Sequence, residues 1–281
     1  MSYVLGNVTL FVFMSGEVLG RFFMVVTLFC LGLMGGFLSG LLGLGGAVVM
    51  IPLMLSVPPL LGVGSLTMKA VAGLSMLQVL ASSVSGIIIH KKNNFVNGKV
   101  LLSIGLPMGI CALGGSYFSK YMEDRTLLIF FGLLVLAALV LLLTRKEERD
   151  DVPSEVFEFR LIPSLLIGAF VGFVSGAVGA GGGFILIPLM LIVLRMPLKL
   201  VVGTSLGIVF IGALMGSIGK LISLQVSVMT ALPLVLGSIP AAQLGAKCSK
   251  ALSSRVLHRI LLGVVLFSAI KVWWAVFAGG K

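Results

Sequence analysis

Apolar residues occur along this chain in long stretches, and each stretch ends at a short polar or basic segment. Two stretches, 22–57 and 161–194, are interrupted near their middles by glycines. Six others are each close to the ~20 residues that cross a bilayer as a helix. These six lie near 68–89, 100–119, 126–144, 200–219, 228–246 and 257–278. The pattern predicts an all-α, polytopic integral membrane protein.

The composition supports this class and excludes others. Hydrophobic residues make up 59% of the chain and charged residues 10%, whereas soluble domains are roughly a quarter charged. The net charge of +11 does not indicate a nucleic acid partner, because the basic residues flank apolar stretches instead of covering one polar face. The chain has no HExxH, GxSxG, P-loop or CxxC motif. We therefore expect no enzyme activity, no metal and no cofactor.

The chain is a tandem duplication. Residues 36–55 read GFLSGLLGLGGAVVMIPLML, and residues 172–191 read GFVSGAVGAGGGFILIPLML, with twelve of twenty positions identical. The match continues further along, where Lys69, Gly73 and Ser75 correspond to Lys199, Gly203 and Ser205. The duplication predicts one transmembrane domain with four parts. They are an N-terminal extension (1–21), a first repeat (22–144), a charged cytoplasmic linker (145–160) and a second repeat (161–281).

The interrupted stretch of each repeat allows two topologies. The stretch 22–57 is too long for one straight crossing, so it either crosses once with a kink or forms a hairpin that returns to its starting side. A single crossing divides the basic residues about evenly between the two sides. With a hairpin, thirteen of the twenty basic residues collect on one side, in segments 91–99, 145–160, 195–199 and 247–259.

The positive-inside rule favours the hairpin. It predicts two inverted-topology repeats, each with a broken-helix hairpin plus three transmembrane helices. The linker then lies in the cytoplasm and both termini lie outside the cell (plasma) membrane, which is the inner membrane of a cell that has two.

An inverted duplication with interrupted helices is typical of secondary transporters, whose substrate site lies where the two breaks meet. Helix N-termini that follow the glycines favour an anion. The absence of Asp and Glu from the predicted spans disfavours a cation. We expect the loop glycines to leave space for the ligand. The candidate substrate-binding residues are Gly43, Gly45, Gly46, Ser75, Gln78, Gly179, Gly181, Gly182, Gly183, Thr204, Ser205 and Gln243.

Two other sets of residues carry alternative interpretations. Lys69 and Lys199 match across the duplication, and they either attract an anion to the two entrances of the pathway or extend to the membrane interface. Glycines spaced by four precede each break, and this spacing predicts close helix packing. They are Gly32, Gly36 and Gly40 in the first repeat, and Gly168, Gly172 and Gly176 in the second.

The motifs GLGGAVVMIPLML and GAGGGFILIPLML, with VVGTSL (201–206) and LGSIPAAQLGA (236–246), resemble those of the sulfite exporter TauE/SafE family, also called the toluenesulfonate uptake permease family. The resemblance implies transport of small sulfur-containing anions such as sulfite, sulfoacetate, thiosulfate or organosulfonates. It also implies functional roles for the glycine loops and for Thr204 and Ser205. One departure is Leu74 in the first repeat, where the second has Thr204.

The leading hypothesis is a secondary transporter that exports a small sulfur-containing anion across the lipid bilayer. A passive anion channel is one alternative. A membrane subunit that assists a sulfur-metabolising enzyme is another. The identity of the anion, a coupling proton or ion, the direction of transport and a homodimer remain open at this point.

Overall fold

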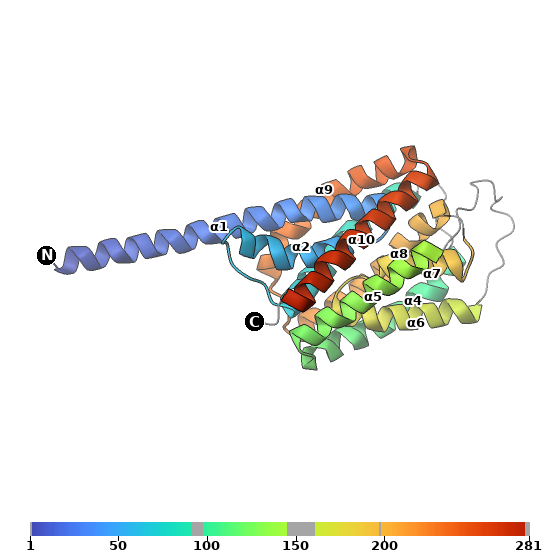
Figure 1. Cartoon of the computed structure of the whole chain (residues 1–281), viewed down its shortest axis with the longest axis horizontal. Helices are drawn as coiled ribbons and strands as arrows, with labels where there is room; N and C mark the ends of the chain where they lie inside the picture. The colour runs from blue at the N-terminus through green and yellow to red at the C-terminus, as the bar shows by residue number, and fades with distance from the viewer. Residues whose placement is uncertain (1, 92–97, 145–160, 197, 279–281) are drawn as a thin grey trace.

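The computed structural model describes residues 2–91, 98–144, 161–196 and 198–278, and the predicted linker 145–160 lies outside them. The described residues are almost entirely helical and contain no strand, which confirms the all-α prediction (Figure 1). The first half comprises α1 (Ser2–Leu42), α2 (Ala47–Leu60), α3 (Met68–Lys91), α4 (Gly98–Phe118), the 3-10 turn η1 (Ser119–Tyr121) and α5 (Asp124–Thr144). The second half comprises α6 (Leu161–Val178), α7 (Gly183–Ile192), α8 (Leu198–Ile222), α9 (Val228–Ala251) and α10 (Ser254–Ala278).

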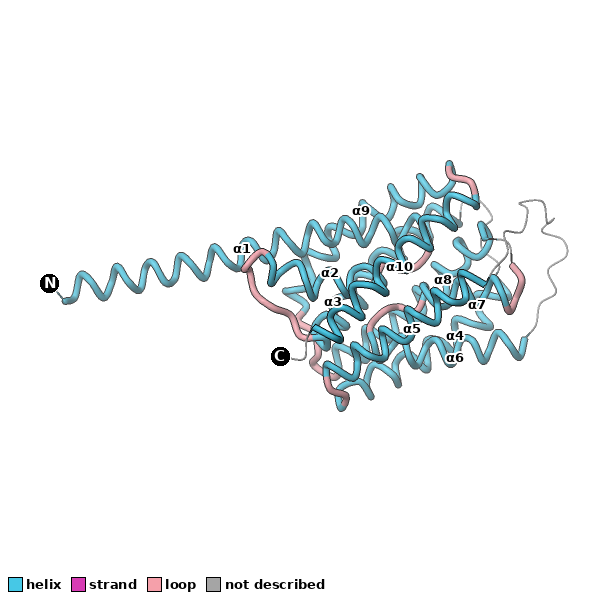
Figure 2. Tube along the Cα trace, viewed as in Figure 1, coloured by secondary structure: helices cyan, strands magenta, loops and turns pink. Residues whose placement is uncertain are grey.

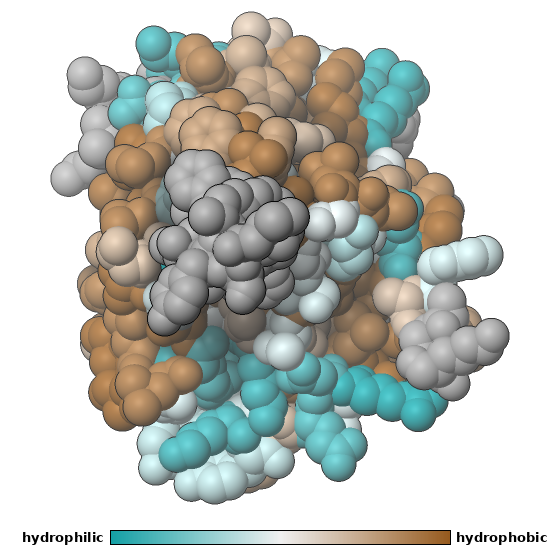
Figure 3. Space-filling view, turned by 90° about the vertical axis from the view of Figure 1, so that its left-hand side faces the viewer, coloured by the Kyte–Doolittle hydropathy of each residue, from teal (hydrophilic) through white to brown (hydrophobic). Residues whose placement is uncertain are grey.

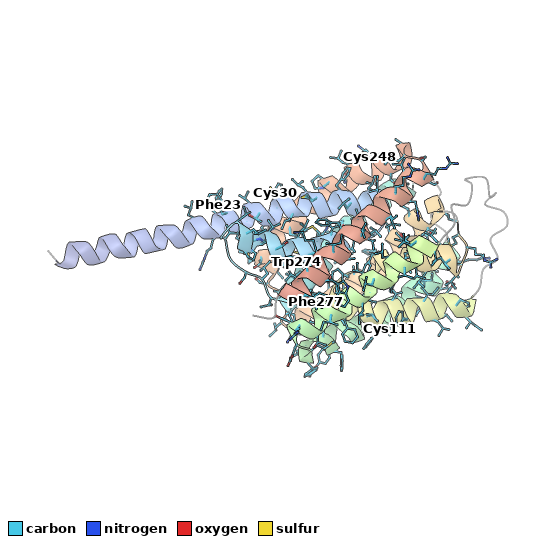
Figure 4. The ribbon with its side chains drawn as sticks, in the orientation of Figure 1. Phe23, Cys30, Cys111, Cys248, Trp274 and Phe277 are labelled. Carbon is cyan, nitrogen blue, oxygen red and sulfur yellow. The ribbon has the colours of Figure 1, made fainter. Side chains whose placement is uncertain are left out.

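Eight helices within the described ranges are long and apolar enough to cross a membrane, and α2 and α7 are shorter apolar helices. Large apolar side chains lie on the outside: Trp274 is 74% exposed and Phe277 is 77% exposed, both on α10 (Figure 4). Figure 3 shows hydrophobic residues covering much of the left flank of the molecule. Serine, threonine and glutamine side chains are buried between the helices. An apolar exterior around a polar interior suits a lipid environment, and the chain is a multi-pass membrane protein.

The interrupted stretch of the first half folds as a hairpin. A Cβ atom at Gly35 of α1 would overlap the side chain of Met50 in α2. Beyond α2, a Cβ atom at Gly64 would lie 3.3 Å from Cε of Met24, near the start of the membrane-spanning part of α1. The chain therefore runs back along α1 before the loop 61–67 leads into α3 (Figure 2). Of the two topologies considered for this stretch, the structure has the hairpin.

Glycine ladders bring two pairs of helices into backbone contact. On α1, a Cβ atom at each ladder glycine would overlap a carbonyl oxygen of α9, in the pairs Gly32–Leu234, Gly36–Ser238 and Gly40–Ala242. The α6 glycines face α4 in the same way, in the pairs Gly168–Ile104, Gly172–Met108 and Gly176–Ala112. Contacts this close require glycine and permit weak Cα–H···O interactions. The predicted packing role of these six glycines is confirmed.

Each broken helix thus packs on a helix of the other half. The remaining contacts are also matched between the halves, since α2 packs on α10, α7 packs on α5, and α3 packs on α8. Figure 1 shows α1 running into the bundle from the left and α6 running into it from the right. The hairpin breaks consequently reach the middle of the bundle, beside α3 and α8.

Candidate functional site

The breaks of the two hairpins meet in the protein interior. A Cβ atom at Gly183 would overlap the carbonyl oxygen of Leu44, so the two loops touch. Val79 of α3 lies against both loops, since Cβ atoms at Gly45 and Gly181 would lie 2.7 and 2.5 Å from its Cγ1. The structure therefore brings together the glycine segments 43–46 and 179–183 that were selected from the sequence.

Two equivalent hydrogen bonds connect each loop to the opposite half. The Ser75 hydroxyl donates to the carbonyl oxygen of Gly179 at 2.6 Å, and the Ser205 hydroxyl donates to that of Gly43 at 3.1 Å. All four residues are buried. Because the serines correspond to each other in the duplication, and the glycines do too, each half positions the loop of the other. In this structure both serines hold backbone.

The loop glycines do not leave open space on the side where a Cβ atom would lie. A Cβ atom at Gly46 would overlap the carbonyl oxygen of Gly35, and one at Gly182 would lie 2.7 Å from Val171 Cγ1. Gly46 and Gly182 each lie immediately before a short helix. Their φ angles are positive, 77° and 73°, and glycine adopts this conformation at little cost. Protein atoms fill the side of each glycine where a Cβ would lie. The sequence indicated that glycine is required at these positions. It did not indicate which atoms face the side where a Cβ atom would lie.

The N-terminus of α2 has backbone N–H groups that lie outside the helical hydrogen-bond ladder. Its first hydrogen bonds run from the N–H groups of Val49 and Met50 to the carbonyl of Gly46, both at 3.3 Å. The N–H groups of Ala47 and Val48 precede this ladder, and Gly46 supplies no side-chain cap. Helix N-termini carry a partial positive charge and bind anions.

Gln78 of α3 places an amide beside this N-terminus. Its side chain is fully buried, and neither Nε2 nor Oε1 has a hydrogen-bond partner among the residues described. A Cβ atom at Gly46 would lie 3.2 Å from Nε2, and one at Gly35 would lie 2.7 Å from it. A buried polar group normally has a partner, so an unpartnered amide here is exceptional.

The second half has the same uncapped helix start, since the N–H groups of Ile185 and Leu186 donate to the carbonyl oxygen of Gly182 at 3.2 and 2.9 Å, but it lacks the amide. Its residue equivalent to Gln78 is Ile208, which is fully buried. At the N-terminus of α7, the groups that face Gly182 are the side chains of Val171, Met108 and the Cβ of Ser175. The central region is therefore asymmetric, because only the first half places an unpartnered amide beside its loop.

The other candidate residues are dispersed. Thr204 is buried next to Ser205, whereas Gln243 is exposed on the outer side of α9, away from the loops. Lys69 begins α3, and its ammonium donates to the carbonyl oxygen of Lys120 at 3.2 Å. Lys199 lies in the first turn of α8, but its side chain lies outside the part that is described.

Lys220 near the end of α8 is a polar residue that sequence reasoning missed. It was counted among the basic residues that flank spans, yet its side chain is fully buried. The signal in the sequence was Gly219 on the same helix, where an added Cβ atom would lie 2.7 Å from Cβ of Ser116, so α4 packs closely there.

Metal ligands are not clustered in the described part of the chain, where no group of three His, Cys, Asp or Glu side chains lies together. Cys30, Cys111 and Cys248 are free thiols on α1, α4 and α9 (Figure 4). The donors that the structure leaves for a ligand are therefore backbone N–H groups and one amide, because the hydroxyls of Ser75 and Ser205 donate to backbone carbonyls. Such a set can bind an anion by hydrogen bonding and contains no nucleophile paired with a base.

Comparison with known families decides the class. The family model described as sulfite exporter TauE/SafE matches residues 28–272, which is most of the chain. The chain belongs to the sulfite exporter TauE/SafE family. The family resemblance drawn from the two glycine-proline motifs is confirmed, and the chain is a member of a family of membrane transporters.

Two relatives match this TauE/SafE protein over about nine tenths of its length. "Probable membrane transporter protein YunE" of Bacillus subtilis (strain 168) is 26% identical over 270 residues, covering 90% of this chain and 99% of the relative. A protein of Xylella fastidiosa (strain Temecula1) named "Probable membrane transporter protein" is 28% identical over 264 residues, covering 91% and 97%. No solved structure matches the chain at a significant level.

Proposed function

We propose that this chain is a secondary transporter that exports small sulfur-containing anions, such as sulfite or organosulfonates, by alternating access around a site between the two glycine loops. The observation that carries the proposal is the unpartnered amide of Gln78 beside the N-terminus of α2. An anion at this point would accept hydrogen bonds from Nε2 and from the N–H groups of Ala47 and Val48. The site would then satisfy donors that are otherwise left unpaired in the interior.

The chemistry of the interior supports an anion over a cation. Among the described residues, the buried polar side chains are serines, threonines, one glutamine and one lysine, and none is acidic. Neutral N–H and O–H donors can solvate oxyanion oxygens. A buried cation would require acidic or carbonyl partners, because the desolvation of a charge is costly without them. The family name points to sulfite, and the donors suit any small oxyanion of this kind.

The matched contacts support an alternating mechanism with inverted-topology repeats. Ser75 and Ser205 hold equivalent loops of opposite halves, as is expected of a transporter built from two inverted-topology repeats. In this proposal the serines position the loops, Gln78 and Thr204 lie nearest the anion, and Lys69 and Lys199 attract it to opposite entrances. Gln243 lies outside the site.

Transport by the purified protein in liposomes tests the proposal. We expect uptake of at least one of sulfite, thiosulfate, sulfoacetate and taurine, and faster uptake when the same anion is loaded inside. Such acceleration indicates a carrier, because an empty carrier returns more slowly than a loaded one. Flux that follows only the membrane potential would establish a channel instead, and flux equal to that of protein-free liposomes for every anion would refute the function.

The proposed topology predicts the sidedness of thiol labelling. Single cysteines are placed in segment 145–160 and at Ser65 in the exposed loop between α2 and α3, after Cys30, Cys111 and Cys248 have been replaced by serine. In intact cells we expect an impermeant maleimide to label position 65 and not the linker. After the membrane is permeabilised, both should react. Labelling of the linker in intact cells would overturn the inverted arrangement.

A further inference from the structure

Lys220 is a buried cation whose hydrogen-bond partners are all neutral. Its ammonium donates to the Ser119 hydroxyl at 2.6 Å, to the carbonyl oxygen of Ala177 at 3.0 Å and to Oε1 of Gln225 at 3.0 Å. The side chain is 0% exposed. Among the described residues none of its partners is a carboxylate, so its positive charge has no counter-ion.

Membrane anchoring does not explain this placement. Lys220 lies two residues before the end of α8, where a lysine normally extends its side chain to the membrane interface. Its side chain instead points inward, and a buried charge without a counter-ion is unfavourable in an apolar interior. The position therefore indicates a role for the charge itself.

A polar cluster around Lys220 lies at the end of α6. The chain turns back after α8 at Leu224, whose φ of 57° is rare for leucine, and this turn brings Gln225 against Lys220. The Gln225 amide also donates to the carbonyl oxygen of Ser116 at 3.1 Å. Ser116 in turn donates to the carbonyl oxygen of Gly176 at 3.1 Å. The cluster thus contacts the last turn of α6, immediately before the glycine loop 179–183.

A second lysine approaches the same loop from α3. Lys69 lies one turn before Ala72, whose carbonyl oxygen faces Gly179. Its ammonium donates to the carbonyl oxygen of Lys120, the residue that follows the Ser119 to which Lys220 donates. Lys69 is partly exposed, whereas Lys220 is buried. Two like charges therefore flank one end of the loop, one at the surface and one inside. An anion that lies between them would supply the counter-ion that is absent among the hydrogen-bond partners of Lys220.

We propose that Lys220 forms a second anion site, where a small oxyanion is held between Lys220 and Lys69 on its way between the surface and the central site. This inference rests on the proposed function. The oxyanion takes over the ammonium hydrogen bonds that Ser119 and Gln225 accept in this structure, and no covalent bond changes. The alternative is that Lys220 serves only to cap the carbonyl groups at the end of α6.

Three variants separate the two roles. Lys220→Met removes the charge and the cap, Lys220→Arg retains the charge, and Ser119→Ala removes one partner of the cap but leaves the ammonium. Lys271→Met is the matched control, since Lys271 is exposed on α10. All four are also made in a Gln78→Leu protein, so that anion binding at the central site does not mask the second site.

The measurement is the rise in thermal unfolding midpoint that sulfite, thiosulfate or methanesulfonate causes relative to chloride at equal ionic strength. We expect Lys220→Met to weaken apparent anion affinity at least tenfold, Lys220→Arg to retain most of it, and Ser119→Ala and Lys271→Met to bind like the parent protein. Counterflow in liposomes, made with Gln78 intact, is expected to fall in Lys220→Met and to persist in Lys271→Met.

Each of the other outcomes contradicts either the second anion site or the proposed transport function. Equal anion affinity in Lys220→Met and its parent overturns the second site, as does an equal loss in Lys220→Met and Ser119→Ala, which indicates a cap alone. Failure of every oxyanion to stabilise the parent overturns it too. If binding depends on Lys220 but wild-type protein transports no anion, the second site stands and the proposed transport function fails.

Discussion

Replacement of Gly115 with alanine is expected to destabilise the protein strongly, whereas the same replacement at the adjacent Gly114 is expected to be neutral or stabilising. A Cβ atom at Gly115 would overlap the carbonyl oxygen of Phe173 and lie 3.1 Å from the backbone nitrogen of Ala177, so α4 and α6 would have to separate. Backbone atoms cannot rotate away, and overpacking of this kind costs about 3 kcal/mol. At Gly114 nothing lies within 4 Å of the added atom.

The two variants are compared by the unfolding midpoint of the detergent-purified protein. Alanine favours a helix over glycine by about 1 kcal/mol, so Gly114→Ala should unfold at the wild-type temperature or above it. Gly115→Ala should unfold at a clearly lower temperature and show a lower yield. A pair of equal midpoints would show that α4 and α6 do not depend on backbone contact at this position.

Replacement of Gln78 with leucine is expected to abolish efficient transport and to raise the stability of the protein. The change removes a buried amide without a partner, whose desolvation costs about 1–3 kcal/mol, so the unfolding midpoint should rise. It also removes a donor to the anion, and a hydrogen bond to a charged partner contributes about 1.5–3 kcal/mol, roughly a ten- to hundredfold change in affinity. Opposite changes in stability and activity identify a residue kept for function.

Counterflow at limiting anion concentration measures the loss, and Ile208→Leu provides the matched control. Ile208 occupies the equivalent position of the second half and is a fully buried apolar side chain. We expect its variant to transport like the wild type. If Gln78→Leu transports like the wild type, the amide does not belong to the anion site. If the variant is less stable than the wild type, Gln78 has a hydrogen-bond partner in the folded protein.

The helices and their breaks were predictable because the membrane imposes long apolar segments and because the duplication shows the same break twice. Close packing through the glycines of α1 was also predictable, since a ladder such as Gly32 and Gly36 has few other uses in a membrane helix, but the partner α9 was not. These features depend on local composition and spacing. Composition and spacing can both be determined from a single sequence.

The details of the site depend on which atoms each residue faces in three dimensions. The spacing of residues in the sequence does not give this. The loop glycines were identified, but the atoms that face Gly46 belong to Gly35, on the other arm of the hairpin. The asymmetry between Gln78 and Ile208 is visible in the aligned halves, but the absence of a partner for Gln78 is not. The burial of Lys220 depends on a turn at Leu224, which has no glycine to mark it.

The exchange of contacts between the halves bears on how this protein assembles. Neither half encloses its own broken helix, because the glycine face of α1 is covered by α9 and that of α6 by α4. A half made alone would expose those faces and lose the serine that positions its loop. The two halves therefore behave as obligate partners, like the subunits of a dimer whose chains have been joined end to end. A defect in one half therefore prevents correct assembly of the other half.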